Sequence, residues 1–210
     1  MTMTTPEAPP NPFATHPNED PDHLAARQSR TDFAAQAQVI RDSRVWSDDH
    51  KTEKLAELYQ AHAQEVADAY ERVLARRQAR LDYLNSLVPS GPDIPEGTSP
   101  ADRELLLAAF RDALGKAKAA SKEHRGQLLA EAERYGDASL QRAVLQHASD
   151  SGDVRLVNEW VAQAHGVSGY SDEKRQLRDA LTPQSRGRGW DYKDFRTPEL
   201  PPEVAKAVYS

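Results

Sequence analysis

The stretch from Ser47 to Val88 contains neither glycine nor proline, the two residues that most readily interrupt a helix. It begins with a serine that can cap a helix, and two acids follow that suit the positive end of the helix dipole. It ends directly before Pro89. At a rise of about 1.5 Å per residue, such a helix would be roughly 60 Å long. We therefore expect one long helix, of the kind that serves spacing, bundling or self-association.

The composition favours extended helices over a thick globular core. The chain has 210 residues, which is enough for one domain or two small ones. Charged residues make up 29% and aromatic residues 7% of the chain, and the mean hydropathy is -0.78. Helices that each bury one narrow apolar stripe fit these values. We predict an all-α fold, with a long helix pair or small bundle followed by a short helical hairpin, and with disordered or irregular termini.

Apolar residues recur in steps of three and four along the long helix, which is the period of a buried stripe. His62 and Arg77 interrupt this stripe, so it is not a regular heptad repeat. A helical pattern also covers residues 22–45, directly before the long helix. An antiparallel hairpin or small bundle fits these features better than a parallel two-stranded coiled coil.

Proline, glycine and charge divide the chain into four segments. Residues 1–21 hold six of the fourteen prolines and no Lys or Arg, which predicts a disordered acidic arm. Residues 22–135 are expected to form the long-helix hairpin or bundle. Residues 136–181 are expected to form a short helical hairpin region. Residues 182–210, which are rich in proline and glycine, are expected to form an irregular tail with aromatic residues.

A local signal at Ser99 marks the start of the next helix. Ser99, Pro100 and Asp102 form a capping box, which predicts a helix start. We expect that helix to run nearly continuously to Tyr135, with a break near Gly126 as the alternative, because a glycine within a helix costs only about 1 kcal/mol relative to Ala.

A short repeat follows, in which Gly-Asp-x-x-Leu occurs at Gly136 and again sixteen residues later at Gly152. Each glycine can end one helix in the left-handed conformation, and each following aspartate can cap the next. This pattern predicts helices over 138–149 and 154–165, with Trp160 in the core. A further helix is expected over 171–181, capped by Ser171, and a helical turn over 203–208.

No familiar catalytic or metal-binding motif occurs. Cysteine is absent, and the seven histidines lie in neither His-Glu-x-x-His nor Glu-x-x-His, so we predict no metal site. There is no glycine-rich phosphate loop and no nucleophile elbow, so we predict no cofactor, no catalytic residue and a non-enzymatic protein. A Ser/His/Asp arrangement stays open here, because its members meet only in the folded chain. No apolar run reaches the ~20 residues of a membrane span.

The C-terminal tail carries the candidate partner-binding residues. Arginine and aromatic side chains dominate interaction hot spots, so the tail can dock on another protein or fold back onto its own helices. Arg-Gly repeats beside aromatic residues can also contact nucleic acid, with a basic helix face at Arg72 to Arg80, although the net charge of -6 argues against a general nucleic-acid binder. We expect the basic face from Arg72 to Arg80 to be exposed to solvent. The candidate residues are Arg186, Arg188, Trp190, Tyr192 and Phe195.

Two passages resemble small helical proteins from the head and structural gene modules of tailed phages and prophages of actinobacteria. One runs from Ile40 to Asp49 into the charged helix, and the other from Tyr135 to Trp160. The resemblance implies a non-enzymatic virion-assembly or head-associated role, and scaffold, connector-associated and minor head protein all stay open. It implies capsid or connector proteins, or further copies of the chain, as partners, with no membrane. The expected location is the host cytoplasm or the virion. The alternative function is a nucleic-acid-binding accessory or regulatory module.

Overall fold

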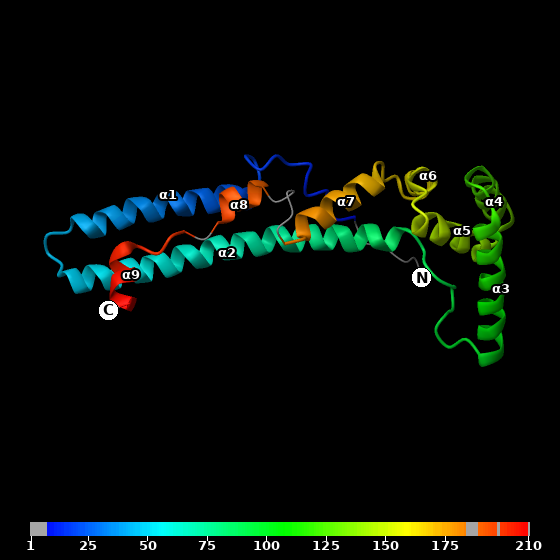
Figure 1. Cartoon of the computed structure of the whole chain (residues 1–210), viewed down its shortest axis with the longest axis horizontal. Coiled ribbons are helices and arrows are strands. Elements are labelled where there is room, and N and C mark those ends of the chain that lie inside the picture. Colours follow the sequence, from blue (N-terminus) through cyan, green and yellow to red (C-terminus); the bar gives the residue numbers. More distant parts are fainter. Residues whose placement is uncertain (1–7, 184–188, 197, 210) are drawn as a thin grey trace, which may run out of the picture. The chain divides into compact units, whose positions relative to one another are not determined.

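The computed structural model describes residues 8–183, 189–196 and 198–209. Within these ranges the secondary structure is helical, with nine helices and no strand, which confirms the all-α prediction (Figure 1). In chain order the helices are α1 (Pro21–Asp42), α2 (Asp48–Leu87), α3 (Pro100–Ala119), α4 (Lys122–Tyr135), α5 (Ala138–Asp150), α6 (Val154–His165), α7 (Tyr170–Leu181), α8 (Gly189–Phe195) and α9 (Pro202–Tyr209).

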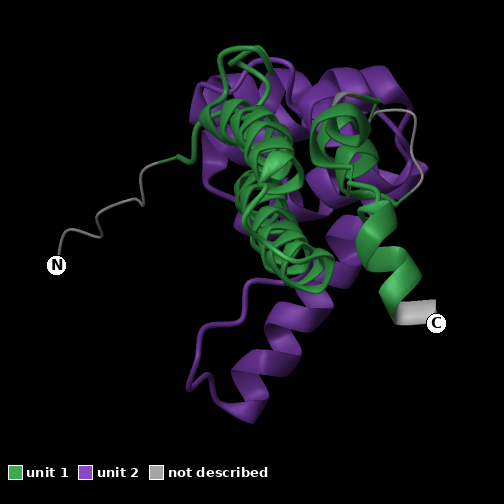
Figure 2. Ribbon diagram, turned by 90° about the vertical axis from the view of Figure 1, so that its left-hand side faces the viewer, with its two compact units in different colours: residues 1–80, 176–210 green, residues 81–175 purple. Residues whose placement is uncertain are grey.

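The chain forms two compact units, coloured separately in Figure 2. Unit 1 contains residues 1–80 and 176–210, and unit 2 contains residues 81–175. Helices α2 and α7 each run from one unit into the other. The segment boundary expected at residue 135 is therefore internal to unit 2, and the C-terminal segment belongs with the first two helices.

In unit 1, α1 and α2 pack as an antiparallel hairpin. Near the connection between them, Ala37 and Leu55 share one buried cluster. Further along, the ring centroid of Phe33 lies 6.4 Å from that of Tyr59, and Ala26 packs in a cluster with Val66. The contact positions rise along α2 as they fall along α1, which defines an antiparallel pair and agrees with the expected hairpin (Figure 1).

Unit 2 is built around α5, which packs against α3, α4 and α6. One face of α5 is fully buried and supplies the centre of this core. Trp160 of α6 is also buried, as predicted from its place on the apolar face of that helix. The fully buried residues of α5 are Ala143, Val144, Leu145 and Ala148.

The expected near-continuous helix from residue 100 to Tyr135 is wrong. Helix α3 ends at Ala119, and Ala120 is extended with a ψ of 142°. Ser121 then caps α4, with its Oγ accepting a hydrogen bond from His124 N at 3.2 Å. The break thus lies at a serine cap and not at Gly126, which sits inside α4. The cap at Ser99 is confirmed, since its Oγ accepts from Asp102 N.

The two repeat helices are confirmed, and Gly136 ends α4 in the left-handed conformation with φ 69°. Only the first aspartate acts as a cap: Asp137 Oδ1 accepts from Leu140 N at 2.9 Å. Asp153 makes no cap hydrogen bond and faces Arg125 instead, with Nη1 and Oδ2 3.5 Å apart. Ser171 likewise is no cap, because α7 begins before it and its Oγ donates to Asn158 Oδ1.

Both chain ends are more ordered by contacts than their composition predicts. In the described part of the N-terminal arm, Pro9 O accepts from Arg80 Nη1 and Pro17 O accepts from Arg27 Nη2, each at 2.7 Å. In the C-terminal segment, α9 matches the expected helical turn, whereas α8 was not predicted. Residues 1–7 and 184–188 lie outside the described residues.

A matched pair of leucines tests the core of unit 2. Leu145 is 0% exposed and Leu105 is 69% exposed. We expect Leu145→Ala to lower the free energy of unfolding by about 2–5 kcal/mol, because it removes buried methyl groups and leaves a cavity. Leu105→Ala should change it by about 0.5 kcal/mol or less. Urea unfolding followed by circular dichroism measures both, and equal losses would contradict this core.

Candidate protein-binding interface

Helix α8 is held against the α1–α2 hairpin by an apolar anchor, Phe195. Its side chain is buried in a cluster contributed by both long helices. Its ring centroid lies 5.0 Å from that of Tyr70 and 4.7 Å from that of His23. Because the ring fills a gap between two helices, it fixes where the C-terminal segment sits. The other buried members of the cluster are Ala26, Val66, Ala69 and Val73.

A buried ion pair lies beside this anchor. Arg77 of α2 donates from both terminal nitrogens to the Asp191 carboxylate, with Nη2 2.9 Å from Oδ1. Both side chains are buried. Two parallel hydrogen bonds between a planar guanidinium and a carboxylate give strong orientation as well as attraction. Arg77, which interrupts the apolar stripe of the long helix, therefore serves to bind α8.

A second carboxylate of α8, Asp194, bonds to α1. Its Oδ2 accepts from His23 Nδ1 at 2.8 Å and from Arg27 Nη2 at 2.9 Å. Burial by itself would raise the pKa of Asp194, but the hydrogen bonds from Arg27 and His23 outweigh it and hold that pKa below its ordinary value. Arg30 adds a hydrogen bond from Nη2 to the Asp194 backbone carbonyl at 2.9 Å. These contacts join α8 to α1 through both side chain and backbone.

The rest of the C-terminal segment follows the hairpin towards the connection between α1 and α2 (Figure 1). Tyr59 Oη donates to Pro198 O at 3.1 Å. Val204 of α9 is buried with Ala37 and Leu55. Arg41 Nε lies 2.8 Å from Glu203 Oε1 at the surface. The described parts of residues 189–205 thus lie along α1 and α2, and we call the surface that they cover the groove.

The basic face from Arg72 to Arg80, expected to be solvated, binds the chain's own segments. Arg72 Nε lies 2.7 Å from Asp22 Oδ1, and Arg76 Nη2 lies 2.8 Å from Asp20 Oδ2. Arg77 and Arg80 are buried. Asp20 also caps α1. Burial would raise the pKa of Asp20, but the hydrogen bonds from Arg76 and from two backbone amides lower it overall.

The five predicted partner-binding residues fall into three groups. Phe195 points inward, in agreement with the alternative in which the tail folds onto its own helices. Tyr192 is 67% exposed, with the Arg196 guanidinium 5.8 Å from its ring centroid. The backbone of Trp190 lies in α8, while its side chain, together with Arg186 and Arg188, is outside the described residues.

The carboxylates that hold α8 were not among the residues predicted from the sequence. Asp191, Asp194 and Phe195 follow the helical spacing of three and four residues, which places all three on one face of a helix. That spacing was the available signal. It was weak because α8 spans only seven residues.

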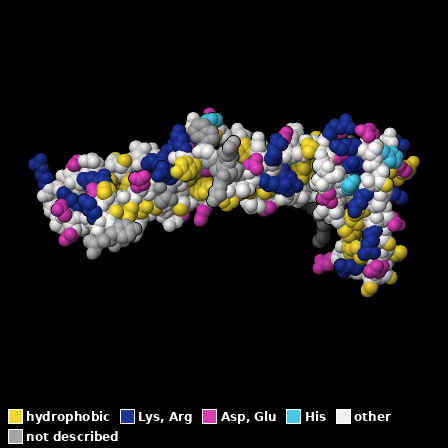
Figure 3. All heavy atoms as spheres, viewed as in Figure 1, with side chains coloured by type: hydrophobic (Ala, Val, Ile, Leu, Met, Phe, Trp, Pro, Cys, Tyr) yellow, Lys and Arg dark blue, Asp and Glu magenta, His cyan; other side chains and the backbone are white. Residues whose placement is uncertain are grey.

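Apolar side chains remain exposed around the connection between α1 and α2. We call this the hairpin tip, defined by Val39, Val45 and Trp46. Val45 is 89% exposed and Trp46 is 39% exposed, and the Trp46 ring makes an edge-to-face contact with His50 at 5.3 Å. Figure 3 shows hydrophobic side chains on the drawn face of unit 1, interspersed with charged ones. An exposed tryptophan beside an exposed valine is a typical protein-binding feature.

A serine, a histidine and an acid do meet in the fold, but not as a catalytic relay. Ser29 Oγ lies 2.7 Å from His62 Nδ1 and also donates to a Glu65 carboxylate oxygen. In a catalytic triad the acid bonds to the second ring nitrogen of the histidine, whereas here Glu65 bonds to Ser29 and His62 Nε2 has no hydrogen-bond partner among the described residues. Burial chiefly, with the charge of Arg30, lowers the pKa of His62. The cluster serves to join α1 to α2.

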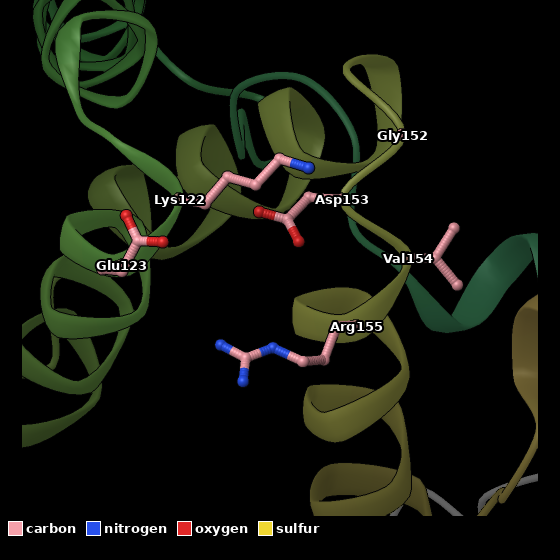
Figure 4. A pocket seen from close by; sticks show the side chains of 6 residues that line it. All are labelled: Lys122, Glu123, Gly152, Asp153, Val154 and Arg155. Carbon is pink, nitrogen blue, oxygen red and sulfur yellow. The ribbon is translucent and has the colours of Figure 1, made fainter.

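A surface pocket of about 560 Å³ in unit 2 lies between the starts of α4 and α6. Figure 4 shows side chains of both signs around it: Lys122 and Arg155 with Glu123 and Asp153. Such mixed charges select neither an anion nor a cation. Among the described residues, no three His, Asp or Glu side chains are grouped to hold a metal ion. No helix in the described ranges is long and apolar enough to cross a membrane.

No known protein-family model matches the chain, and no curated protein or solved structure shows significant similarity to it. What it does must therefore be inferred from its own residues. The groove filled by the C-terminal segment and the exposed hairpin tip are its two best-defined candidate sites.

Acidification should weaken the docking of α8. A carboxyl whose folded pKa lies below its ordinary value of 3.8 contributes stability above that value, and this contribution is lost as the pH falls through the folded pKa. We expect Asp194→Asn to cost about 1.5–3 kcal/mol at pH 7 and to reduce the further loss between pH 6 and about pH 2. Asp179→Asn, the same change at an exposed acid of α7, is the control. Equal pH slopes for wild type and Asp194→Asn in urea unfolding would contradict this role.

The buried pair should behave differently from a surface pair. Arg77→Met leaves the Asp191 carboxylate buried without its partner, so we expect a loss of about 3–5 kcal/mol in the free energy of unfolding. The double variant Arg77→Met/Asp191→Leu should recover part of that loss. Arg175→Met, which breaks the exposed pair with Asp172, should cost about 1 kcal/mol or less. Similar losses from the two single variants in urea unfolding would count against the buried pair.

Proposed function

We propose that this chain is a non-enzymatic assembly protein that works by binding other proteins. The observation that carries the proposal is the hairpin tip, where Val45 and Trp46 are exposed although the apolar stripes of α1 and α2 are covered. Exposed aromatic and aliphatic side chains at the end of a rigid helical hairpin form a compact binding feature. A virion scaffold or head-associated role fits such a feature, with capsid or connector proteins as partners.

The partners of the buried ionisable groups support this proposal. Arg77 and Asp191 pair with each other, Asp194 pairs with His23, and His62 bonds to Ser29. Each of these pairs joins one segment of the chain to another. A pocket of unit 1 brings Asp20, His23 and Arg77 together, and each of these side chains is already bonded to another part of the chain.

The resemblance of residues 40–49 to phage head-module proteins adds support, because Val45 and Trp46 of the hairpin tip lie within that passage. Under this proposal the protein acts in the host cytoplasm or within the virion. The nucleic-acid alternative draws less support, because Arg72, Arg76 and Arg77 already have carboxylate partners within unit 1 and are not available to phosphates.

The proposal predicts a specific loss of binding from changes at the hairpin tip. The full chain would be co-expressed with the products of the genes next to its own and captured by an affinity tag. We expect a neighbouring structural protein to co-purify. Val45→Glu/Trp46→Ala should weaken that complex by about 30-fold or more in Kd, the size of a hot-spot loss.

Leu105→Glu, an apolar-to-acid change at an exposed position of unit 2, is the matched control and should leave the complex intact. Circular dichroism would verify that all variants keep their helix content. Binding that is unchanged in the tip variant would contradict the tip as the binding feature. A full chain that captures neither a neighbouring gene product nor a second copy of itself would overturn the proposed function.

A further inference from the structure

We propose that the C-terminal segment, residues 189–205, is exchanged between two copies of the chain, so that the α8–α9 segment of one copy fills the α1–α2 groove of the other. This inference rests on the proposed function, because it names a second copy as one partner in assembly. The observation behind it is that this segment supplies one side of the contact and α1 and α2 supply the other.

The contacts divide cleanly into a receptor side and a ligand side. The ligand side supplies Asp191, Asp194 and Phe195 from α8 and, from α9, Glu203 and Val204. The receptor side lies wholly within α1 and α2. Its charged members are His23, Arg27, Arg30, Arg41 and Arg77. No residue of unit 2 takes part in these contacts.

Charge complementarity selects this segment as the occupant. Three carboxylates of the segment meet four basic side chains of the hairpin, and an aromatic ring and a valine fill the apolar clusters between them. A foreign peptide would have to reproduce acids at the spacing of Asp191 and Asp194 and an aromatic residue directly after. A second copy of this chain carries that pattern by necessity.

The two sides of the contact come from opposite ends of the chain, with residues 81–175 between them. An own segment and a segment from another copy therefore make identical contacts. The ratio of exchanged to unexchanged chains depends on the effective concentration of a chain's own segment relative to the concentration of other copies. Exchange of identical elements in this way needs no new interface, and it closes into a symmetric dimer.

Cysteine cross-linking tests the exchange directly, because the natural chain has no cysteine. Arg41 and Glu203 form an exposed pair across the groove, so both can be replaced without disturbing the core. The full-length Arg41→Cys/Glu203→Cys variant would be refolded at concentrations up to about 1 mM and treated with a short bis-maleimide. Exchange yields covalent dimers whose links, mapped by mass spectrometry, join position 41 to position 203 of another copy.

A ten-fold rise in chain concentration should raise the ratio of dimer to monomer by up to about ten-fold. Internally linked monomers at every concentration would overturn the exchange. So would a dimer by light scattering without interchain links between positions 41 and 203, although that dimer would leave the proposed function standing. Loss of the internal link only when another protein is added would assign the groove to that protein instead.

Charge reversal gives a second, independent measurement. Arg77→Asp disrupts the groove of one chain, and Asp191→Arg disrupts the segment of the other. In an exchanged pair of the two variants, one interface unites the two reversed residues and the other is wild type. We expect the mixture to dimerise at least ten-fold more strongly than either variant alone.

The Arg77→Asp/Asp191→Arg chain is the matched control, because it joins both reversed residues within one molecule. Its thermal unfolding shows whether the reversed pair can form. Where it forms and the mixture still gains nothing, the exchange is overturned. Where it does not form, the cysteine result decides alone.

Discussion

The buried charge pairs between the long helices and the C-terminal segment are the contacts on which unit 1 depends. Arg77 with Asp191, and His23 with Asp194, replace apolar contacts at positions where the stripe of α2 and the start of α1 would otherwise be incomplete. Desolvating such groups is costly, and only close, mutually satisfied hydrogen bonds offset that cost. The pairs therefore contribute less to net stability than to uniqueness. They accept one segment, in one register, with its carboxylates opposite the right bases.

The same constraint explains why the α1–α2 hairpin alone is incomplete. Two antiparallel helices bury only the stripes that face each other, and a third element is needed to cover the flank. Phe195 covers one end of that flank and Val204 the other. Asp20, which caps α1, and Asp22, in the first turn of α1, add to this arrangement by binding Arg76 and Arg72 of α2. Both ends of unit 1 are thus held by acids on bases of the long helix.

Helix positions could be predicted from the sequence wherever local chemistry decides them. The long helix lies between a serine cap and Pro89, and the paired Gly-Asp repeats end and start α4 to α6. Local chemistry could not decide what the interruptions at His62 and Arg77 mean, because their partners are distant in the sequence. The break at Ser121 differs from the expected one for another reason. Gly126 has the lower helix propensity, but the serine cap five residues earlier separates α3 from α4.

The candidate sites show the same division. The basic face of α2 could be seen in the sequence, but whether it faced solvent or carboxylates depended on where the start of α1 and the returning residues 189–205 lie in space. That return depends on side-chain pairing rather than on a large apolar core, because the buried residues of the described segment are the acids Asp191 and Asp194 and the apolar Phe195, Pro201 and Val204. The segment is attached mainly by charge pairs and two apolar anchors. This property distinguishes it from α5, whose buried face is inseparable from the core of unit 2.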